Sequence, residues 1–267
     1  MTAGRRRAAR SNCLHPAIDL NADLGEGFGH SRLLEDEALL DLVSSANIAC
    51  GFHAGDATTM RDTVRAAKPR GVSLGAHPSY PDIPGFGRRE LGLSPQDIRF
   101  HVARQLHALR DVCAAEHAKL SYVKPHGALY NRAAKDSAAA DAIVRAICEV
   151  DSSLLLLGLA QSEMARAAER GGVGFAAEAF IDRAYKPDGS LARRTEPGAV
   201  LHDVPAAVHR AITLVKSNTI VADDGSQLRV SAQSLCVHGD NPDAAPMLRE
   251  LRARLEEAGV SIAPFAA

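Results

Sequence analysis

The chain has 267 residues, of which 46% are hydrophobic and 24% charged, and this composition excludes a disordered, collagen-like or coiled-coil protein. Thirty-one basic and thirty-two acidic residues give a formal net charge of −1, so nothing indicates binding to nucleic acid or to a membrane surface. The longest apolar stretch, residues 154–160, is much shorter than the ~20 residues that span a bilayer.

The first sixteen residues differ in composition from the rest. They contain four arginines (Arg5, Arg6, Arg7 and Arg10) and no acidic residue, and the apolar segment of a signal peptide does not follow them. A short charged segment without a pattern cannot bury enough surface to order itself. We therefore expect residues 1–16 to form a disordered basic tail, with a contact arm as the alternative, and residues 17–267 to form a single domain.

From Ala17 onward, short apolar runs alternate with segments of helical periodicity. The runs typical of strands are residues 17–20, 45–49, 72–76, 120–124, 154–159, 174–180 and 235–238. Residues that can cap the helices between them are Asp56, Ser94, Asp136, Asp203 and Asn241, and weaker helical segments lie at 33–43 and 163–169. Seven strands alternating with about as many helices predict one α/β domain with a parallel sheet. The pattern alone does not separate a closed barrel from an open, doubly wound sheet.

Polar residues gather where the predicted strands end. The period of two places Asp19, Asn21 and Asp23 on one face of the first strand. Four of the eleven histidines follow the C-terminal end of a strand, close to glycine or proline: His53, His77, His126 and His238. In α/β barrels the active site is built at that end of the strands. Burying such a cluster would cost several kcal/mol unless it were paired or used, so we expect an active-site mouth.

The candidate residues fall into two groups. The candidate catalytic residues are Asp19, Asp23, His53, His77, Lys124 and His126. The candidate substrate- or phosphate-binding residues are Asn21, Gly25, Glu26, Gly27, Asn47, Asp56, Arg88, Tyr130, His238 and Asp240. The histidines would transfer protons near neutral pH. Lys124 would stabilise developing negative charge, or alternatively pair with a carboxylate for stability alone.

A metal centre is the less favoured use of these side chains. One aspartate and two histidines are a suitable ligand set for zinc or another first-row metal, and Asp19, His53 and His126 would then be the ligands. No H-x-H or H-x-x-x-H motif lies at the strand ends, so the ligands would have to come from different strands.

Nucleotide and nucleophile motifs are absent from the sequence. There is no G-x-x-x-x-G-K-[ST], and the glycine-rich residues 25–29 lack the G-x-G-x-x-G spacing, although such a loop can still wrap a phosphate. The loop at 86–89 carries Arg88 and Arg89, which could receive an anion or lie in solvent. G-x-S-x-G is missing, and Cys50 is interpreted as a small buried residue. Five cysteines without a C-x-x-C pair indicate reduced thiols in a cytoplasmic protein.

Taken together, the motifs resemble the LamB/YcsF family. They are, in family order, DLNADLGEGFG (19–29), SANIACGFHAGD (45–56), GAHPSYPD (75–82), VKPHGALYN (123–131) and VHGD (237–240). The resemblance covers the chain from about Ile18 to its end. It implies a seven-stranded (β/α) barrel of the glycoside hydrolase/deacetylase type. It also implies ATP-dependent opening of 5-oxo-L-proline to L-glutamate, with ATP and Mg²⁺ as cofactors and with two partner subunits, B and C.

The residues are compatible with that chemistry. A five-membered lactam is an unreactive amide, and ATP could phosphorylate the amide oxygen to make it a leaving group. Such a step needs cations for the phosphate and a carboxylate or imidazole for proton transfer, and Asp19 or Asp23 could activate the water or the amide. Two alternatives stay open: a metal-dependent amide or acetyl hydrolase that needs no ATP, and a non-catalytic scaffold protein within the complex.

Deleting residues 1–15 tests the expected tail. Because a segment that buries no surface adds no stability, the midpoint of thermal unfolding should stay within a few degrees of that of the full chain. A large drop in the midpoint would instead show that the segment packs on the domain.

Overall fold

Seven parallel strands of the described chain close into a barrel. The computed structural model describes residues 17–28 and 33–266, so the expected tail, residues 1–16, lies outside the described residues. The barrel strands are β1 (Ala17–Leu24), β2 (Ser45–Ala49), β3 (Ser73–His77), β4 (Leu120–Val123), β5 (Leu155–Leu159), β6 (Phe175–Phe180) and β9 (Ser234–Val237). They pair in that order, and β9 closes the barrel on β1. All seven predicted strands are confirmed, and the closed barrel is the arrangement adopted.

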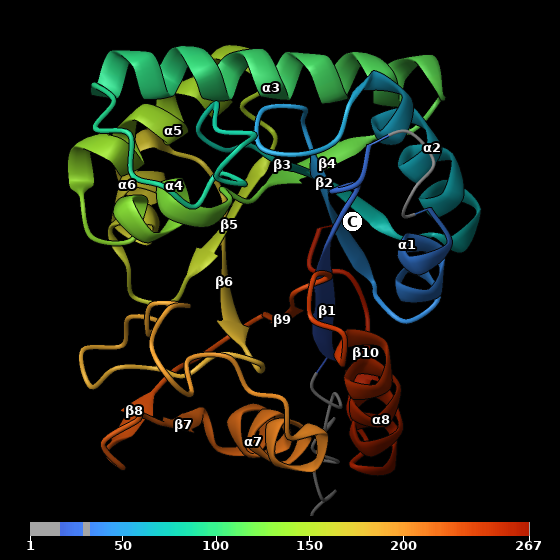
Figure 1. Ribbon diagram of the computed structural model, residues 1–267, viewed down its shortest axis with the longest axis vertical. Coiled ribbons are helices and arrows are strands. Elements are labelled where there is room, and N and C mark those ends of the chain that lie inside the picture. Colours follow the sequence, from blue (N-terminus) through green and yellow to red (C-terminus); the bar gives the residue numbers. More distant parts are fainter. Residues whose placement is uncertain (1–16, 29–32, 267) are drawn as a thin grey trace, which may run out of the picture.

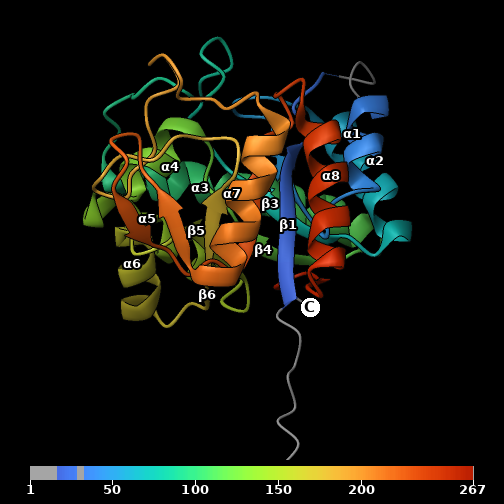
Figure 2. The ribbon, with the colours of Figure 1, turned by 90° about the horizontal axis from the view of Figure 1, so that it is seen from below.

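Helices surround the barrel, and β1 runs up the centre of Figure 2 between α7 and α8. The helices are α1 (Leu33–Leu40), α2 (Ala57–Ala67), α3 (Pro95–Ala115), α4 (Gly127–Ala133), α5 (Ser137–Val150), α6 (Glu163–Gly171), α7 (Val204–Ser217) and α8 (Ala244–Glu257). The 21-residue α3 lies across the top of Figure 1 and packs mainly on α5. None of the helices in the described part of the chain has the length and apolar character needed to span a bilayer.

Side-chain caps set the beginnings of these helices, as the sequence predicts. Asp56, Ser94, Asp136 and Asp203 each accept a hydrogen bond from a backbone N–H in the first turn. The last helix differs slightly, because its N-cap is Asp243 rather than Asn241. Three parts of the fold have no counterpart among the predicted elements: α4, the hairpin of β7 (Thr219–Val221) and β8 (Gln227–Arg229), and β10 (Ser261–Ile262), which pairs with the start of β1. These elements are too short to carry a periodic signal.

Apolar side chains fill the space between barrel and helices, whereas the barrel interior is largely polar. On β1, Leu20, Ala22 and Leu24 belong to the main apolar core. The alternate residues Asn21 and Asp23 reach β4 across the interior, because both accept a hydrogen bond from Lys124. The period of two therefore separates the two faces of β1 as the sequence predicts.

A hydrogen-bonded ladder of side chains runs along the barrel interior. Asn21 Nδ2 donates to Ser234 Oγ (2.7 Å), and Asn47 Nδ2 donates to Asn21 Oδ1 (2.7 Å). The hydroxyl of Tyr122 donates to Asn47 Oδ1 (2.7 Å). Gly75 makes room for this tyrosine, because a Cβ at that position would lie 2.1 Å from the ring. The glycine in β3 is thus required by a close approach inside the barrel.

Asp19 lies at the end of this ladder that is nearest the N-terminal ends of the strands, away from the histidines. Its Oδ1 accepts hydrogen bonds from the hydroxyls of Ser44 and Ser45, both at 2.6 Å, and its Oδ2 accepts one from Ser234. The expected position of Asp19 in the mouth is therefore wrong. Period two gives the correct face of the strand but not the depth along the barrel, and Asp19 is aligned with Ser234, the first residue of β9.

The position of Asp19 predicts how stability changes with pH. Burial raises its pKa from 3.8 to about 6, although the three serine hydroxyls oppose this shift. An acid with a raised folded-state pKa favours folding while it is protonated, so its contribution is lost as the pH rises from about 4 to above 6. Asp19→Asn removes this titration. Between pH 4 and pH 7.5 the variant should gain roughly 2 kcal/mol of unfolding free energy relative to the wild type.

Urea unfolding at the two pH values measures this difference. Ser44→Ala removes one of the three hydroxyl donors without removing the carboxyl group, so that variant should keep the pH dependence. Parallel stability curves for the wild type and Asp19→Asn would contradict the prediction.

Candidate active site

Three buried histidines meet at the C-terminal ends of β2, β3 and β4. His77 is the last residue of β3, and its Nε2 lies 2.9 Å from Nδ1 of His126, which follows β4. The ring of His53 stacks on that of His126, with 3.9 Å between the centroids and 8° between the planes. The structure therefore brings these three together, as the strand-end rule predicts.

Backbone carbonyls fix the orientation of two of these rings. His77 Nδ1 lies 2.7 Å from the carbonyl oxygen of Lys124, and His126 Nε2 lies 3.0 Å from that of Phe86. A carbonyl only accepts, so each of these nitrogens carries the proton. The loop that supplies the Phe86 carbonyl approaches closely at Gly87, whose φ is +65° and whose Cβ would lie 2.9 Å from that of His53. Only glycine adopts this conformation without strain and without a clash there.

Two carboxyl groups adjoin the histidines. Asp23 Oδ1 accepts hydrogen bonds from Asn47 Nδ2 (2.8 Å) and Lys124 Nζ (2.9 Å), and its Oδ2 lies 3.4 Å from His77 Nε2. Burial would raise the pKa of Asp23, but His77 and Lys124 outweigh it and hold this pKa well below its usual range. Glu26 Oε1 lies 3.6 Å from Nδ1 of His126.

The same Glu26 oxygen lies 3.4 Å from Nε2 of His53. Burial lowers the pKa of His53, and it lowers the pKa of His126 well below the usual value, with the neighbouring histidines acting in the same direction. Both imidazoles are therefore neutral at pH 7 and available as proton acceptors.

Lys124 is a fixed positive charge between β1 and β6. Its Nζ lies 2.9 Å from Asp23 Oδ1 and 3.3 Å from Glu178 Oε2, and it also donates to Asn21 Oδ1 (3.1 Å). Burial would lower the pKa of this ammonium, but the facing acids, Asp23 foremost, hold it well above the usual value. Of the two roles considered for Lys124, pairing with a strand-end carboxylate is present in the structure. Lys124 also lines the base of the pocket, so its positive charge lies close to a ligand bound there.

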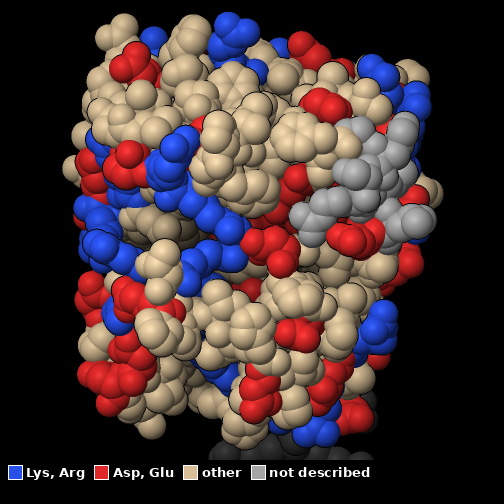
Figure 3. All heavy atoms as spheres, in the orientation of Figure 1, with Lys and Arg blue, Asp and Glu red and all other residues tan. Residues whose placement is uncertain are grey.

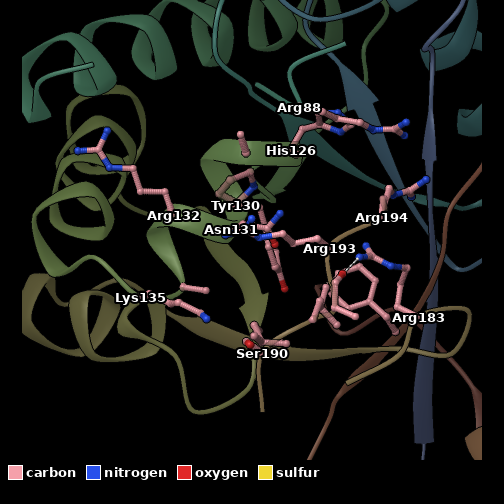
Figure 4. A pocket seen from close by; sticks show the side chains of 18 of the residues that line it. Arg88, His126, Tyr130, Asn131, Arg132, Lys135, Arg183, Ser190, Arg193 and Arg194 are labelled. Atoms are coloured by element: carbon pink, nitrogen blue, oxygen red, sulfur yellow. Dashed lines mark hydrogen bonds between the residues drawn. The ribbon is translucent and has the colours of Figure 1, made fainter. Parts of the chain in front are cut away.

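A pocket of about 850 Å³ opens above this cluster (Figures 3 and 4). Asp23, His77, Lys124 and His126 form its base, and Tyr130, Phe180 and His238 are among the residues of its wall. Basic side chains gather around the hollow in Figure 3: Arg88, Arg132, Lys135, Arg183, Lys186, Arg193 and Arg194. A pocket with acid–base groups at its base and cations at its rim suits a small anionic ligand.

The rim cations differ in how they are paired. Arg194 Nη1 lies 3.1 Å from Asp240 Oδ2, and the same carboxylate pairs with Arg88. Arg132 pairs with Asp136 at 2.9 Å. Within the described residues Arg193 makes no ion pair, and Figure 4 shows it projecting into the pocket. Arg193 is therefore the rim cation best placed to meet an incoming anion.

Several predicted binding residues lie outside the pocket lining. Asn21 and Asn47 belong to the interior ladder, and Asp56 caps α2 by accepting from Thr59 N (2.8 Å). The backbone N–H of Gly25 donates to Asp36 Oδ2 (2.9 Å), and neither this glycine nor Gly27 lines the pocket. Arg88, Tyr130 and His238 do line it, and Asp240 holds two rim arginines in place.

A second group of residues at the site was not predicted from the sequence. They are Glu178 and Asp182 with three arginines of the loop after β6: Arg183, Arg193 and Arg194. Glu178 is the one charged residue of β6, which is a signal that could have found it. Asp182 lies 3.0 Å from His238 Nδ1, and this histidine outweighs the effect of burial and lowers the pKa of Asp182 to about 2. The loop has no periodicity from which its fold over the mouth could be predicted.

Comparison with known proteins agrees with this architecture. The sequence model of the LamB/YcsF family matches residues 18–267. A protein of Agrobacterium fabrum named as the A subunit of 5-oxoprolinase is 49% identical over 94% of this chain and 98% of its own. A protein of the same name from Streptomyces avermitilis is 49% identical over 93% of this chain and 100% of its own.

A solved structure extends the likeness to the fold. The crystal structure of the lactam utilization protein from Thermus thermophilus superposes with a TM-score of 0.87 at 42% identity. The alignment covers 93% of this chain and all of that one. A match along nearly the whole chain, in sequence and in fold, shows that the chain belongs to the LamB/YcsF family.

Proposed function

We propose that this chain is the component of a 5-oxoprolinase that binds the cyclic amide 5-oxo-L-proline and carries the acid–base groups that open it to L-glutamate. The observation that carries the proposal is the pocket itself, in which Asp23, His77 and His126 lie at the base of a cation-rimmed cavity. The names of the relatives, which refer to 5-oxoprolinase and to lactam utilization, support the choice of substrate.

The shape and charge of the pocket support the ligand class. The proposed substrate is a small ring with one carboxylate, and the rim offers Arg193 to this group. A cavity of about 850 Å³ is larger than such a ring needs. The remaining space can hold a phosphate on the amide oxygen, beside the other rim cations.

ATP is used by the assembled complex in this proposal. The amide of a five-membered lactam resists attack by water, and phosphorylation of its oxygen would make the ring carbon electrophilic enough for water to add. The adduct would then break its C–N bond to give the free amine and an acyl phosphate, which a second water hydrolyses to glutamate and phosphate. The loop at Gly25 supports placing the nucleotide elsewhere, because its backbone N–H is already bound by Asp36. We assign ATP with Mg²⁺ to the complex that this chain forms with partner subunits B and C.

The proposed chemical roles follow from the charge states. His126 and His77 accept and return protons, since burial keeps the first neutral and both residues line the base of the pocket. Lys124 stabilises the negative charge that develops on the substrate oxygens when water adds to the phosphorylated ring carbon. Asp19, which is bound by three serines, has no part in this step.

A second function is a cyclic-amide hydrolase that needs no ATP. It is favoured by four potential metal ligands that converge in the site, those of Asp23, Glu26, His77 and His126. The reconstituted reaction separates the two functions. The purified chain, with and without its partner subunits, is mixed with 5-oxo-L-proline, and glutamate is followed with and without ATP. Glutamate that requires both ATP and the partners supports the first function, whereas glutamate formed without ATP supports the second.

His126→Asn should lower the rate of glutamate formation in the complex by about 10²–10⁴, as expected when a proton-transfer group is lost. His101→Asn, on α3 and away from the pocket lining, is the matched control and should keep full activity. Circular dichroism and co-purification with the partners check folding and assembly. A folded, assembled His126→Asn complex with normal turnover would point to a scaffold role for this chain.

Lys124→Met is a less informative variant. Lys124 is buried against two carboxylates, and removing one partner of such a group costs about 3–5 kcal/mol of stability. Loss of activity in this variant would therefore not separate a catalytic role from a structural one.

Arg193→Gln should raise the KM for 5-oxo-L-proline about tenfold and leave kcat almost unchanged, because a charge-assisted contact to the substrate carboxylate is worth roughly 1.4 kcal/mol. Arg254→Gln, on the exposed surface of α8, removes the same charge far from the rim and should leave both constants unchanged. Equal KM values for wild type and Arg193→Gln would place the substrate carboxylate elsewhere.

A further inference from the structure

Four buried acceptor atoms from three segments of the chain face one another beside the pocket. His77 Nε2 and His126 Nδ1 lie 2.9 Å apart. Asp23 Oδ2 lies 3.4 Å from the first of them, and Glu26 Oε1 lies 3.6 Å from the second. All four side chains are buried, and ligand atoms from each lie within 4.8 Å of one another.

Both histidines present a lone pair to this centre. The opposite nitrogen of each ring donates a hydrogen bond to a backbone carbonyl, that of Lys124 for His77 and that of Phe86 for His126. In the neutral rings the nitrogens that face each other are therefore both unprotonated. Two facing lone pairs at 2.9 Å repel each other, so either a proton or a metal cation must lie between these nitrogens.

Glu26 gives an independent indication of a missing positive partner. Its carboxylate is buried, with 6% of the side chain exposed, and it points at His126 and His53. Its Oε1 has no hydrogen-bond partner of normal geometry among residues 17–28 and 33–266, and the nearest ring nitrogens are His53 Nε2 at 3.4 Å and His126 Nδ1 at 3.6 Å. A buried carboxylate oxygen without a donor is costly, and a cation in the centre would satisfy it.

The charges around the centre are also unbalanced. Asp23, Glu26 and Glu178 supply three carboxylates, whereas Lys124 is the one ammonium in contact with them among the described residues. Lys124 approaches Asp23 through Oδ1, which leaves Oδ2 directed at His77. A divalent ion would neutralise the excess of two negative charges.

We propose that a divalent transition-metal ion, with Zn²⁺ as the best fit, binds between Asp23, Glu26, His77 and His126. Zinc–ligand bonds of about 2.0–2.1 Å in a tetrahedron place neighbouring donor atoms about 3.3 Å apart. The separations of 2.9, 3.4 and 3.6 Å bracket this value. The carbonyls behind both rings are the partners that metal-binding histidines commonly have. Two imidazoles favour Zn²⁺ over Mg²⁺, which prefers oxygen ligands and water.

This ligand set differs from the one expected from sequence. Asp19 is bound by three serine hydroxyls, and His53, which stacks on His126, directs its Nε2 at Glu26 Oε1 (3.4 Å) and lies outside the four-residue cluster. A second group of potential ligands, Asp23, Cys236 and His238, is less suitable. The Lys124 ammonium lies 3.0 Å from Cys236 Sγ, and His238 Nδ1 is already paired with Asp182.

A bound ion would take the lone pairs of His77 Nε2 and His126 Nδ1, so a filled metal site and the proton-transfer roles proposed above for these two histidines exclude each other. The test of the site therefore measures binding and not turnover. Untagged full-length protein is stripped with a chelator, dialysed and titrated with Zn²⁺ by calorimetry. The expected result is one Zn²⁺ per chain with a Kd below about 1 μM, and roughly 100-fold weaker binding of Mg²⁺. Titration with Co²⁺ should give the visible absorption of a four-coordinate site, which reports the ligand geometry directly.

Two variants and two controls identify the ligands. Glu26→Gln and His77→Ala should each weaken Zn²⁺ binding at least about tenfold. His101→Ala, outside the cluster, and His238→Ala, from the second group, should bind Zn²⁺ as the wild type does. If the His77 variant does not fold by circular dichroism, the Glu26 variant alone decides. Wild-type protein that binds neither Zn²⁺ nor Co²⁺, or binding lost in His238→Ala but kept in Glu26→Gln, would overturn the proposal.

Discussion

One buried lysine holds together the site and the interior of the barrel. The side chain of Lys124 joins Asp23 at the end of β1 to Glu178 of β6, across the space that the barrel encloses. Its backbone carbonyl accepts a hydrogen bond from His77 Nδ1. A single residue after β4 thus directs Oδ2 of Asp23 and Nε2 of His77 toward the same point. The relative positions of the acid and the imidazole follow from where β4 ends.

Hydrogen bonds between polar side chains inside the barrel fix the orientation of Asp23. Asn47 donates to both Asn21 and Asp23, and Tyr122 donates to Asn47 in turn. Side chains whose hydrogen bonds are satisfied in a buried network have few alternative rotamers, so the residues above them are preorganised. A barrel filled by apolar side chains would be simpler to stabilise, but it would not fix the orientation of Asp23.

The base of the pocket is formed by strand ends, and part of its rim is formed by a loop. The groups at its base, including Asp23 and His77, lie at strand ends inside the barrel. The rim cations Arg193 and Arg194 lie on the connection between β6 and α7, which has no helix or barrel strand of its own. Proton transfer needs fixed distances, whereas the capture of an anion tolerates movement. The proposed chemistry is therefore placed on the framework and the proposed substrate contact on a loop.

The sequence by itself determined the elements and the end of the barrel at which polar groups gather. All seven barrel strands and the caps of Asp56, Ser94, Asp136 and Asp203 could be predicted, because period two and N-cap chemistry are local properties. The histidines at 53, 77 and 126 could be placed together because the C-terminal ends of parallel strands share one side of a sheet.

Only the tertiary structure decided which of these groups touch. Asp19 and Asp23 share a face of β1, but strand register puts the first beside Ser234 and the second beside Lys124. Glu26 becomes part of the cluster because the chain turns back toward His126 after β1. Arg193 reaches the pocket through a loop without periodicity. Depth in a barrel, ring stacking and loop paths depend on contacts between segments far apart in the chain, and no local pattern encodes them.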